Sequence, residues 1–161
     1  MTIISAKEHH FKSIISIYNW AVTNTTATLD EELKTLDNYK EFLSSFTRLP
    51  LIVSLSGEQV SGWACLKQYS DRSAYNTTVE LSVYVDPSFH GQGIATKLME
   101  EVILRAKALG LHSILSRITT ETASCIHLHR KFGFTDVGVM TEVGFKFDKY
   151  VDVLIMQKIF N

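Results

Sequence analysis

Apolar and polar residues alternate along the stretch Val79–Val85, and this period of two predicts a half-buried strand. The valines face one side of the strand, whereas Glu80 faces the other. Asp86-Pro87 ends the strand, because proline cannot donate a hydrogen bond to a neighbouring strand. Two glycines follow. Apolar side chains four residues apart then indicate an amphipathic helix over residues 94–109, with Gly110 as its C-terminal cap.

The same patterns predict the other elements of the chain. Asp37 is the expected N-cap of a second helix, and the Thr- and Asn-rich segment Thr23–Thr28 is expected to be a loop too polar for the core. Strands are expected at residues 3–4, 51–55, 60–69, 114–118, 137–140 and 151–156, and further helices at 11–22, 38–46 and 122–132. This order indicates an α/β fold, α+β in stricter usage, with a mixed sheet. No repeat or linker interrupts it, so we expect one domain over residues 1–161.

The loop Gly91–Gly93 between the central strand and its helix has the features of an anion site. The first N–H groups of a helix lack an intrahelical acceptor, and the helix dipole adds positive charge there. A tight turn between packed elements explains the same pattern, since short glycine motifs are common. The loop is not a P-loop, because no Gly-Lys-Ser/Thr follows. A dinucleotide fold is not favoured either, because no acidic residue ends the next strand.

The segment His90–Ala95 resembles the pyrophosphate motif of the GNAT N-acetyltransferase superfamily, Gln/Arg-x-x-Gly-x-Gly/Ala, and Leu128–Phe134 resembles the family's second signature. Segments at residues 17–19, 72–75, 80–85 and 143–153 look like the branch of phosphinothricin and methionine sulfoximine acetyltransferases. The resemblance covers nearly the whole chain. It implies the GNAT fold, in which central strands splay apart around the pantetheine of acetyl-CoA, and it suggests a homodimer.

The resemblance also implies how acetyl-CoA is held. Main-chain groups at the end of the central strand would bind the thioester and the pantetheine, and the amides of the loop and first helical turn would bind the pyrophosphate. The residues assigned to the donor in this way are Val83, Tyr84, Val85, Gly91, Gln92, Gly93, Ile94, Ala95, Thr96 and Thr122. His90 departs from the usual Gln/Arg and removes a fixed positive side chain. Thr122 replaces an asparagine, and its hydroxyl could take over part of that residue's contact.

Acyl transfer from a thioester needs a base for the amine and a proton for the departing thiolate. Glu80 is the candidate base, because the branch places a catalytic glutamate at this position. An outward glutamate on an exposed sheet face is the alternative. His129 stands where many family members carry the tyrosine that protonates the thiolate. The alternative is a histidine at the helix surface or core edge. A nucleophilic Cys125 is not expected, because a cysteine and a histidine on one short helix are usually packing residues.

For the acceptor, the resemblance implies that Arg72 and Tyr75 clamp a carboxylate or phosphinate and that Thr28 lies near the amine. Guanidinium groups suit such anions because they donate two parallel hydrogen bonds. Solvated loop residues are the alternative. The predicted function is acetylation of a small amino-acid-like amine. Other amines remain open, namely a polyamine, an aminoglycoside or a protein N-terminus. So do a non-catalytic acyl-CoA sensor and a phosphate-binding module unrelated to coenzyme A.

The composition of the chain indicates which classes of binding partner and which cellular compartment to expect. The formal net charge is −1 with both signs interspersed, so neither a nucleic-acid surface nor a membrane-binding patch is indicated. The N-terminus lacks the apolar run of a signal peptide, and with only two cysteines we expect a cytoplasmic protein. No metal site is expected, because His127 and His129 lie on different sides of a helix.

Overall fold

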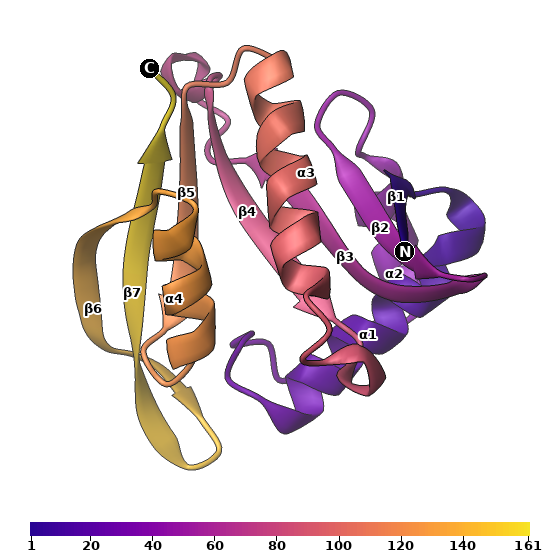
Figure 1. The fold of residues 1–161 in the computed structure, drawn as a ribbon. Helices are drawn as coiled ribbons and strands as arrows, with labels where there is room; N and C mark the ends of the chain where they lie inside the picture. The colour runs from indigo at the N-terminus through magenta and orange to yellow at the C-terminus, as the bar shows by residue number, and fades with distance from the viewer.

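The computed structural model describes residues 1–161, and a seven-stranded sheet in the order β1-β2-β3-β4-β5-β7-β6 forms its centre (Figure 1). Only β4 and β5 run parallel, and every other neighbouring pair is antiparallel. The predicted α/β fold with a mixed sheet is therefore confirmed. The strands are β1 Thr2–Ser5, β2 Leu51–Ser56, β3 Gln59–Gln68, β4 Thr78–Val85, β5 Ser113–Thr119, β6 Thr135–Lys146 and β7 Lys149–Ile159, and the helices are α1 Phe11–Asn24, α2 Leu36–Ser44, α3 Ile94–Ala108 and α4 Ala123–Lys131.

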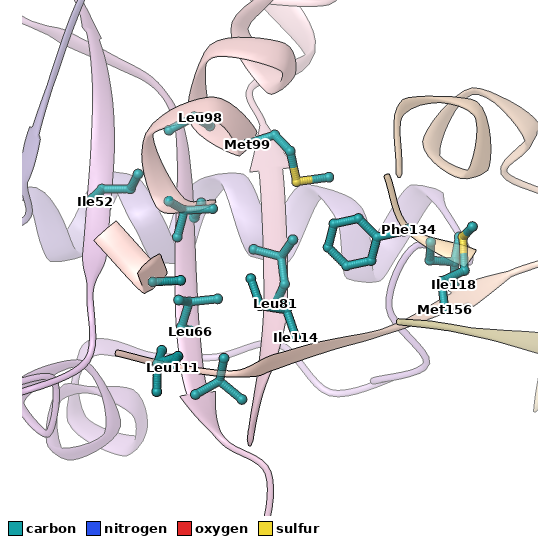
Figure 2. Close-up of a cluster of buried hydrophobic side chains, with 14 of the residues drawn as sticks. Ile52, Leu66, Leu81, Leu98, Met99, Leu111, Ile114, Ile118, Phe134 and Met156 are labelled. Carbon is teal, nitrogen blue, oxygen red and sulfur yellow. The ribbon is translucent and has the colours of Figure 1, made fainter. Parts of the chain in front are cut away.

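Helices cover both faces of the sheet, and each face has its own apolar cluster. On one face α3 packs on the central strands, and Figure 2 shows Met99 of this helix pointing toward Phe134, above the strands that carry Leu66 and Leu81. On the other face α1 and α2 cover a cluster that includes Trp63 of β3. Successive side chains of a strand alternate between faces, so β4 places Leu81 in the first cluster and Tyr84 against the second. The strand is therefore covered on both faces, whereas the sequence period predicted a half-buried strand.

The two parallel strands stay together for only a short distance. β4 and β5 pair at three positions, of which Glu80 with Leu115 is the last. Beyond it, β4 continues along β3 as far as Val85, and β5 continues along β7 as far as Thr119. Figure 1 shows the two strands diverging from the top of the view downwards. The predicted splay is confirmed, and it leaves main-chain groups of both strands without a partner strand between them.

Two predictions about element ends are wrong. The second helix begins at Leu36 with Thr35, not Asp37, as its N-cap. Thr35 is the N-cap because it forms a reciprocal capping box with Asn38. The Thr35 hydroxyl accepts from Asn38 N at 3.2 Å, and the Asn38 side chain accepts from Thr35 N at 2.7 Å. The closing strands are also longer than predicted. They form one hairpin whose two-residue turn, Phe147-Asp148, has φ values of 54° and 58°.

The segment predicted to be too polar for the core is partly buried. Thr26 and Thr28 are only 7% and 8% exposed. The Lys146 ammonium, itself 2% exposed, donates to the carbonyl oxygens of Thr25 and Thr28 at 2.8 Å each. Hydrogen bonds from the far end of the chain thus satisfy this polar segment, which a local sequence pattern does not reveal. None of the helices combines the length and apolar character needed to cross a membrane.

Candidate active site

A cavity of about 510 Å³ opens where β4 and β5 diverge. Its walls include residues 80–84 of β4 and residues 116–119 of β5. A neighbouring hollow of about 500 Å³ shares Glu80, Arg117 and Met140 with it. The site therefore consists of two adjacent spaces that share a charged side-chain pair in their walls.

The shared charged pair consists of Glu80 and Arg117. The Glu80 carboxylate accepts from Arg117 Nε at 2.9 Å and from Arg117 Nη2 at 2.8 Å. Lys67 Nζ lies 4.0 Å from the same carboxylate. The Glu80 side chain is only 12% exposed, so it is not the outward surface glutamate that was the alternative. Arg117 was not among the predicted site residues, although an arginine inside the mostly apolar predicted strand 114–118 was a usable signal.

Aromatic side chains form the wall of the cavity beneath α1 and α2. Tyr84 lies edge-to-face with Tyr18 and stacks on Trp63, at centroid distances of 5.2 and 5.0 Å. The Tyr18 hydroxyl bonds Thr28 Oγ1 at 2.8 Å and donates to Asp30. Burial, followed by the bond to Asp30, raises the pKa of Tyr18 well above its usual value, so the hydroxyl stays protonated. The indole N–H of Trp63 is buried without a partner. Of these residues, Thr28 and Tyr84 were predicted as part of the site, whereas Tyr18, Asp30 and Trp63 were not.

His129 lines the cavity from α4 and is 4% exposed. Its Nδ1 lies 2.8 Å from the Cys125 carbonyl oxygen, and its Nε2 lies 3.0 Å from Ser116 Oγ. Because a carbonyl oxygen can only accept, Nδ1 carries the proton and the neutral ring accepts from Ser116 at Nε2. Burial lowers the pKa of His129, and the Cys125 carbonyl opposes that shift without cancelling it. The Ser116 hydroxyl therefore occupies the one nitrogen of the ring that is free to accept, and both residues line the cavity.

We expect the stability of the fold to decrease as the pH falls below about 6.5, the ordinary pKa of histidine. Between that value and the lowered pKa of folded His129, the unfolded chain binds more protons, so the free energy of unfolding falls with pH. His129→Gln should make this slope shallower, while His10, whose pKa burial also lowers, keeps part of it. Chemical denaturation at several pH values measures the slope. The exposed His127, two residues away on α4, supplies the control: His127→Gln should leave the slope unchanged.

Cys125 also lines the cavity, but its thiol is not activated. Burial raises the pKa of Cys125 to about 11, so the thiolate is scarce near neutral pH. The nearest ring nitrogen is His129 Nδ1, 3.7 Å from the sulfur, and its proton is directed at the carbonyl oxygen. This geometry argues against a nucleophilic cysteine. No group of three or more His, Cys, Asp or Glu side chains gathers in the structure.

The glycine loop before α3 adopts a conformation that requires glycine. Gly91 and Gly93 have φ values of 77° and 76°, in the left-handed region. The first main-chain bond of α3 runs from Lys97 N to Gly93 O at 3.2 Å, so the N–H groups of residues 94–96 have no helical acceptor. His90 turns away from this loop, and its Nε2 lies 3.1 Å from Val85 O. The loop therefore offers backbone amides rather than a side-chain cation.

The structure gathers part of the predicted set around the main cavity. The Thr122 hydroxyl, which lines it, donates to Thr119 O at 2.7 Å. Arg72 and Tyr75 line the neighbouring hollow, where Arg72 forms no ion pair. Val85 and the loop and helix start from Gly91 to Thr96 line neither space. The predicted residues in the main cavity are Thr28, Glu80, Val83, Tyr84, Thr122 and His129.

Comparison with known proteins assigns the class. The acetyltransferase (GNAT) family profile matches residues 14–134. An L-methionine sulfoximine/L-methionine sulfone acetyltransferase of Salmonella typhimurium is 33% identical over 159 residues, covering 98% of this chain and 93% of that protein. A crystal structure of a GNAT superfamily phosphinothricin acetyltransferase from Sinorhizobium meliloti in complex with acetyl-CoA has a TM-score of 0.96 at 32% identity, covering 99% of this chain and 88% of the other. A ribosomal-protein-alanine N-acetyltransferase structure from Brucella melitensis has a TM-score of 0.96 at 34% identity, covering 99% and 100%.

The chain belongs to the acetyltransferase (GNAT) family, and it is an acetyltransferase with the GNAT fold. Within that family it is similar to proteins named methionine sulfoximine, methionine sulfone and phosphinothricin acetyltransferases. The resemblance that the sequence motifs indicated is thereby confirmed.

Proposed function

We propose that the protein transfers the acetyl group of acetyl-CoA to the α-amino group of a small amino-acid-like acceptor of the phosphinothricin or methionine sulfoximine type. One observation carries this proposal: the Glu80–Arg117 ion pair, whose carboxylate is buried and whose guanidinium is half exposed, lies in the wall of the cavity at the point where β4 and β5 separate. A carboxylate and a guanidinium side by side match the ammonium and carboxylate of an amino acid. The similar relatives named for such acceptors support the same acceptor class.

On the donor side, the proposal assigns the free edge of β4 and the start of α3 to acetyl-CoA. Beyond Glu80 the main chain of β4 lacks a strand on its β5 side, so Val83–Val85 can pair with an extended pantetheine. The unsatisfied amides of Gly91–Thr96 suit the pyrophosphate. Thr122, in the wall of the cavity, is assigned to the same donor. Acetyl-CoA supplies an acyl group already activated as a thioester. A β4 amide donor polarises its carbonyl oxygen as negative charge develops there.

On the acceptor side, Glu80 acts as the base. It takes the proton from the acceptor ammonium, and the free amine then attacks the thioester carbon directly, without a covalent enzyme intermediate. The departing thiolate gains its proton at the opposite wall. We assign that delivery to the Ser116 hydroxyl and His129 in its imidazolium form: Ser116 gives its proton to the thiolate while it accepts the proton on His129 Nε2, and His129 returns to its neutral form with the proton on Nδ1. Solvent supplies the proton that forms the imidazolium. Thr28, fixed by Tyr18 and Lys146, completes the wall on the acceptor side.

The charges around the site favour an acceptor that carries a carboxylate. Lys67, Arg72 and Arg117 bring three positive charges, whereas Glu80 and Asp30 bring two negative ones. A polyamine or aminoglycoside would need an excess of acidic side chains instead. The relative from Brucella melitensis makes a protein N-terminus the second candidate. An N-terminal residue in a protein has no free α-carboxylate to place on these cations, so we rank that acceptor below a free amino acid.

We further propose one catalytic domain that forms a homodimer in the cytoplasm. β6 is an edge strand whose apolar side chains are exposed, and a surface of this kind is normally covered in native proteins. These side chains are Val137, Val139, Val143 and Phe145, each more than half exposed. The two free cysteines suit a reducing compartment. Light scattering tests the assembly: a dimeric mass is expected, and a monomeric mass at micromolar concentration would contradict it.

Release of the coenzyme A thiol from acetyl-CoA tests the proposed function. The acceptors are phosphinothricin, methionine sulfoximine and methionine sulfone, with spermidine, an aminoglycoside and an alanine-initiated peptide as contrasts. We expect turnover with the amino-acid analogues only. Turnover confined to the cations or the peptide would keep the family and exclude the proposed acceptor class. Coenzyme A binding without turnover of any acceptor would favour a sensor.

A further inference from the structure

We infer that Arg117 binds the α-carboxylate of the acceptor and thereby selects amino acids over other amines. The inference rests on the proposed function, which it deepens by assigning the group that recognises the carboxylate. Arg117 lines both spaces, and it donates two parallel hydrogen bonds to the carboxylate of Glu80, the proposed base.

The guanidinium has donors to spare. It carries five N–H groups. Two of them, one on Nε and one on Nη2, donate to Glu80. The other three, two on Nη1 and one on Nη2, are free to donate to a second carboxylate. The Arg117 side chain is 56% exposed although Glu80 beside it is 12% exposed, and it lines both spaces, so it stays accessible to a ligand. A carboxylate there can form the parallel pair of hydrogen bonds that guanidinium favours.

The charges that line the neighbouring hollow favour a further negative charge. Its charged side chains are Arg72, Glu80 and Arg117, two cations to one anion. Lys67 adds a third positive charge 4.0 Å from the Glu80 carboxylate. Asp30, in the main cavity, is already bonded by Tyr18 and lies 3.6 Å from Lys34. An acceptor carboxylate on Arg117 therefore balances a local excess of positive charge.

Binding in this way also positions the amine. The amino and carboxyl groups of an α-amino acid are attached to the same carbon. A carboxylate held by Arg117 therefore places the ammonium within reach of Glu80, which shares the guanidinium. Arg117, Glu80 and the acceptor thus form one arrangement: Arg117 binds the acceptor carboxylate and orients the acceptor, and Glu80 accepts the proton of its ammonium group.

The test compares methionine sulfone with 3-(methylsulfonyl)propylamine, the same molecule without its carboxylate. For the wild type we expect kcat/KM to favour the amino acid strongly. Arg117→Met should lower that preference about 100-fold, the range of a lost charge-assisted pair. The ratio of the two values is the readout, because any damage to Glu80 affects both acceptors and cancels. Arg117→Lys, which keeps the charge but not the fork, should restore only part of the preference.

Arg130→Met is the matched control. Arg130 is 57% exposed, is likewise paired through Nε and Nη2 with a carboxylate, that of Asp136, and lines neither space. Its removal should leave the preference unchanged. An unchanged preference in Arg117→Met would overturn the inference. If that variant turns over neither amine, calorimetry with 4-(methylsulfonyl)butanoic acid, the analogue without the amino group, decides instead. Lost binding supports the inference, and retained binding overturns it.

If the wild type acetylates neither methionine sulfone nor its decarboxylated analogue but does acetylate a peptide, the proposed function fails. The inference about Arg117 fails separately, when the wild type prefers the amino acid and the variant keeps that preference.

Discussion

Glu80→Gln is expected to lower kcat about 1000-fold at neutral pH, within the range of a lost general base. The amide keeps the size of the side chain and can still accept one hydrogen bond from Arg117, but it cannot take a proton from the acceptor ammonium. Glu80 does not lie at the glycine loop, so the affinity for coenzyme A should not change. Steady-state kinetics with methionine sulfone give the first quantity, and calorimetry with coenzyme A gives the second.

Raising the pH should recover part of the lost rate, because more of the acceptor amine is then unprotonated without help from the enzyme. Glu101→Gln is the matched control: Glu101 also pairs with an arginine, Arg105, at 2.7 Å, but it lines neither space. Its kinetics should match the wild type. A Glu80→Gln variant that retains wild-type kcat at neutral pH would exclude Glu80 as the base.

Gly62→Ala is expected to destabilise the fold by about 2 kcal/mol, as overpacking of a close contact does. A Cβ atom at this position would lie 2.9 Å from the main-chain oxygen of Tyr84 and 3.1 Å from side-chain atoms of Ile94 and Leu98. The first of these contacts is backbone inside the sheet, so it cannot move aside as a flexible side chain could. Chemical denaturation measures the loss.

The same substitution should weaken coenzyme A binding, because Tyr84 and Ile94 belong to the two elements assigned to the donor. Gly138→Ala, on β6, provides the comparison. A Cβ atom there meets nothing within 4 Å, so its stability should stay within about 0.5 kcal/mol of the wild type. Equal stability of the two variants would contradict this prediction, because it would show that β3 and β4 can move apart enough to admit a Cβ atom at residue 62 without loss of stability.

Local periodicity was sufficient to predict β4, α3 and the glycine loop between them. Each of these depends on residues close together in the sequence. Alternation along Val79–Val85 follows the period of a strand, and left-handed φ angles at Gly91 and Gly93 are ones that glycine adopts freely. The positions of Glu80 and His129 at the cavity also agree with the prediction, although their roles remain proposals.

The remaining site residues depend on contacts between distant segments. Arg117 reaches Glu80 because β4 and β5 are parallel neighbours, and 37 residues of chain separate the two side chains. Lys146 satisfies the Thr25–Thr28 segment across a separation of more than a hundred residues. No sequence period encodes such pairs. The N-cap of α2 is a different case, since the choice of Thr35 follows from its reciprocal bond with Asn38.

The most direct test of the account is mass spectrometry of the product formed by the wild-type protein from acetyl-CoA and methionine sulfone. We predict N-acetyl-methionine sulfone, formed with release of free coenzyme A, and almost none with Glu80→Gln in the same time. Absence of this product from the wild-type reaction, together with acetylation of spermidine or of a peptide N-terminus, would contradict the central claim.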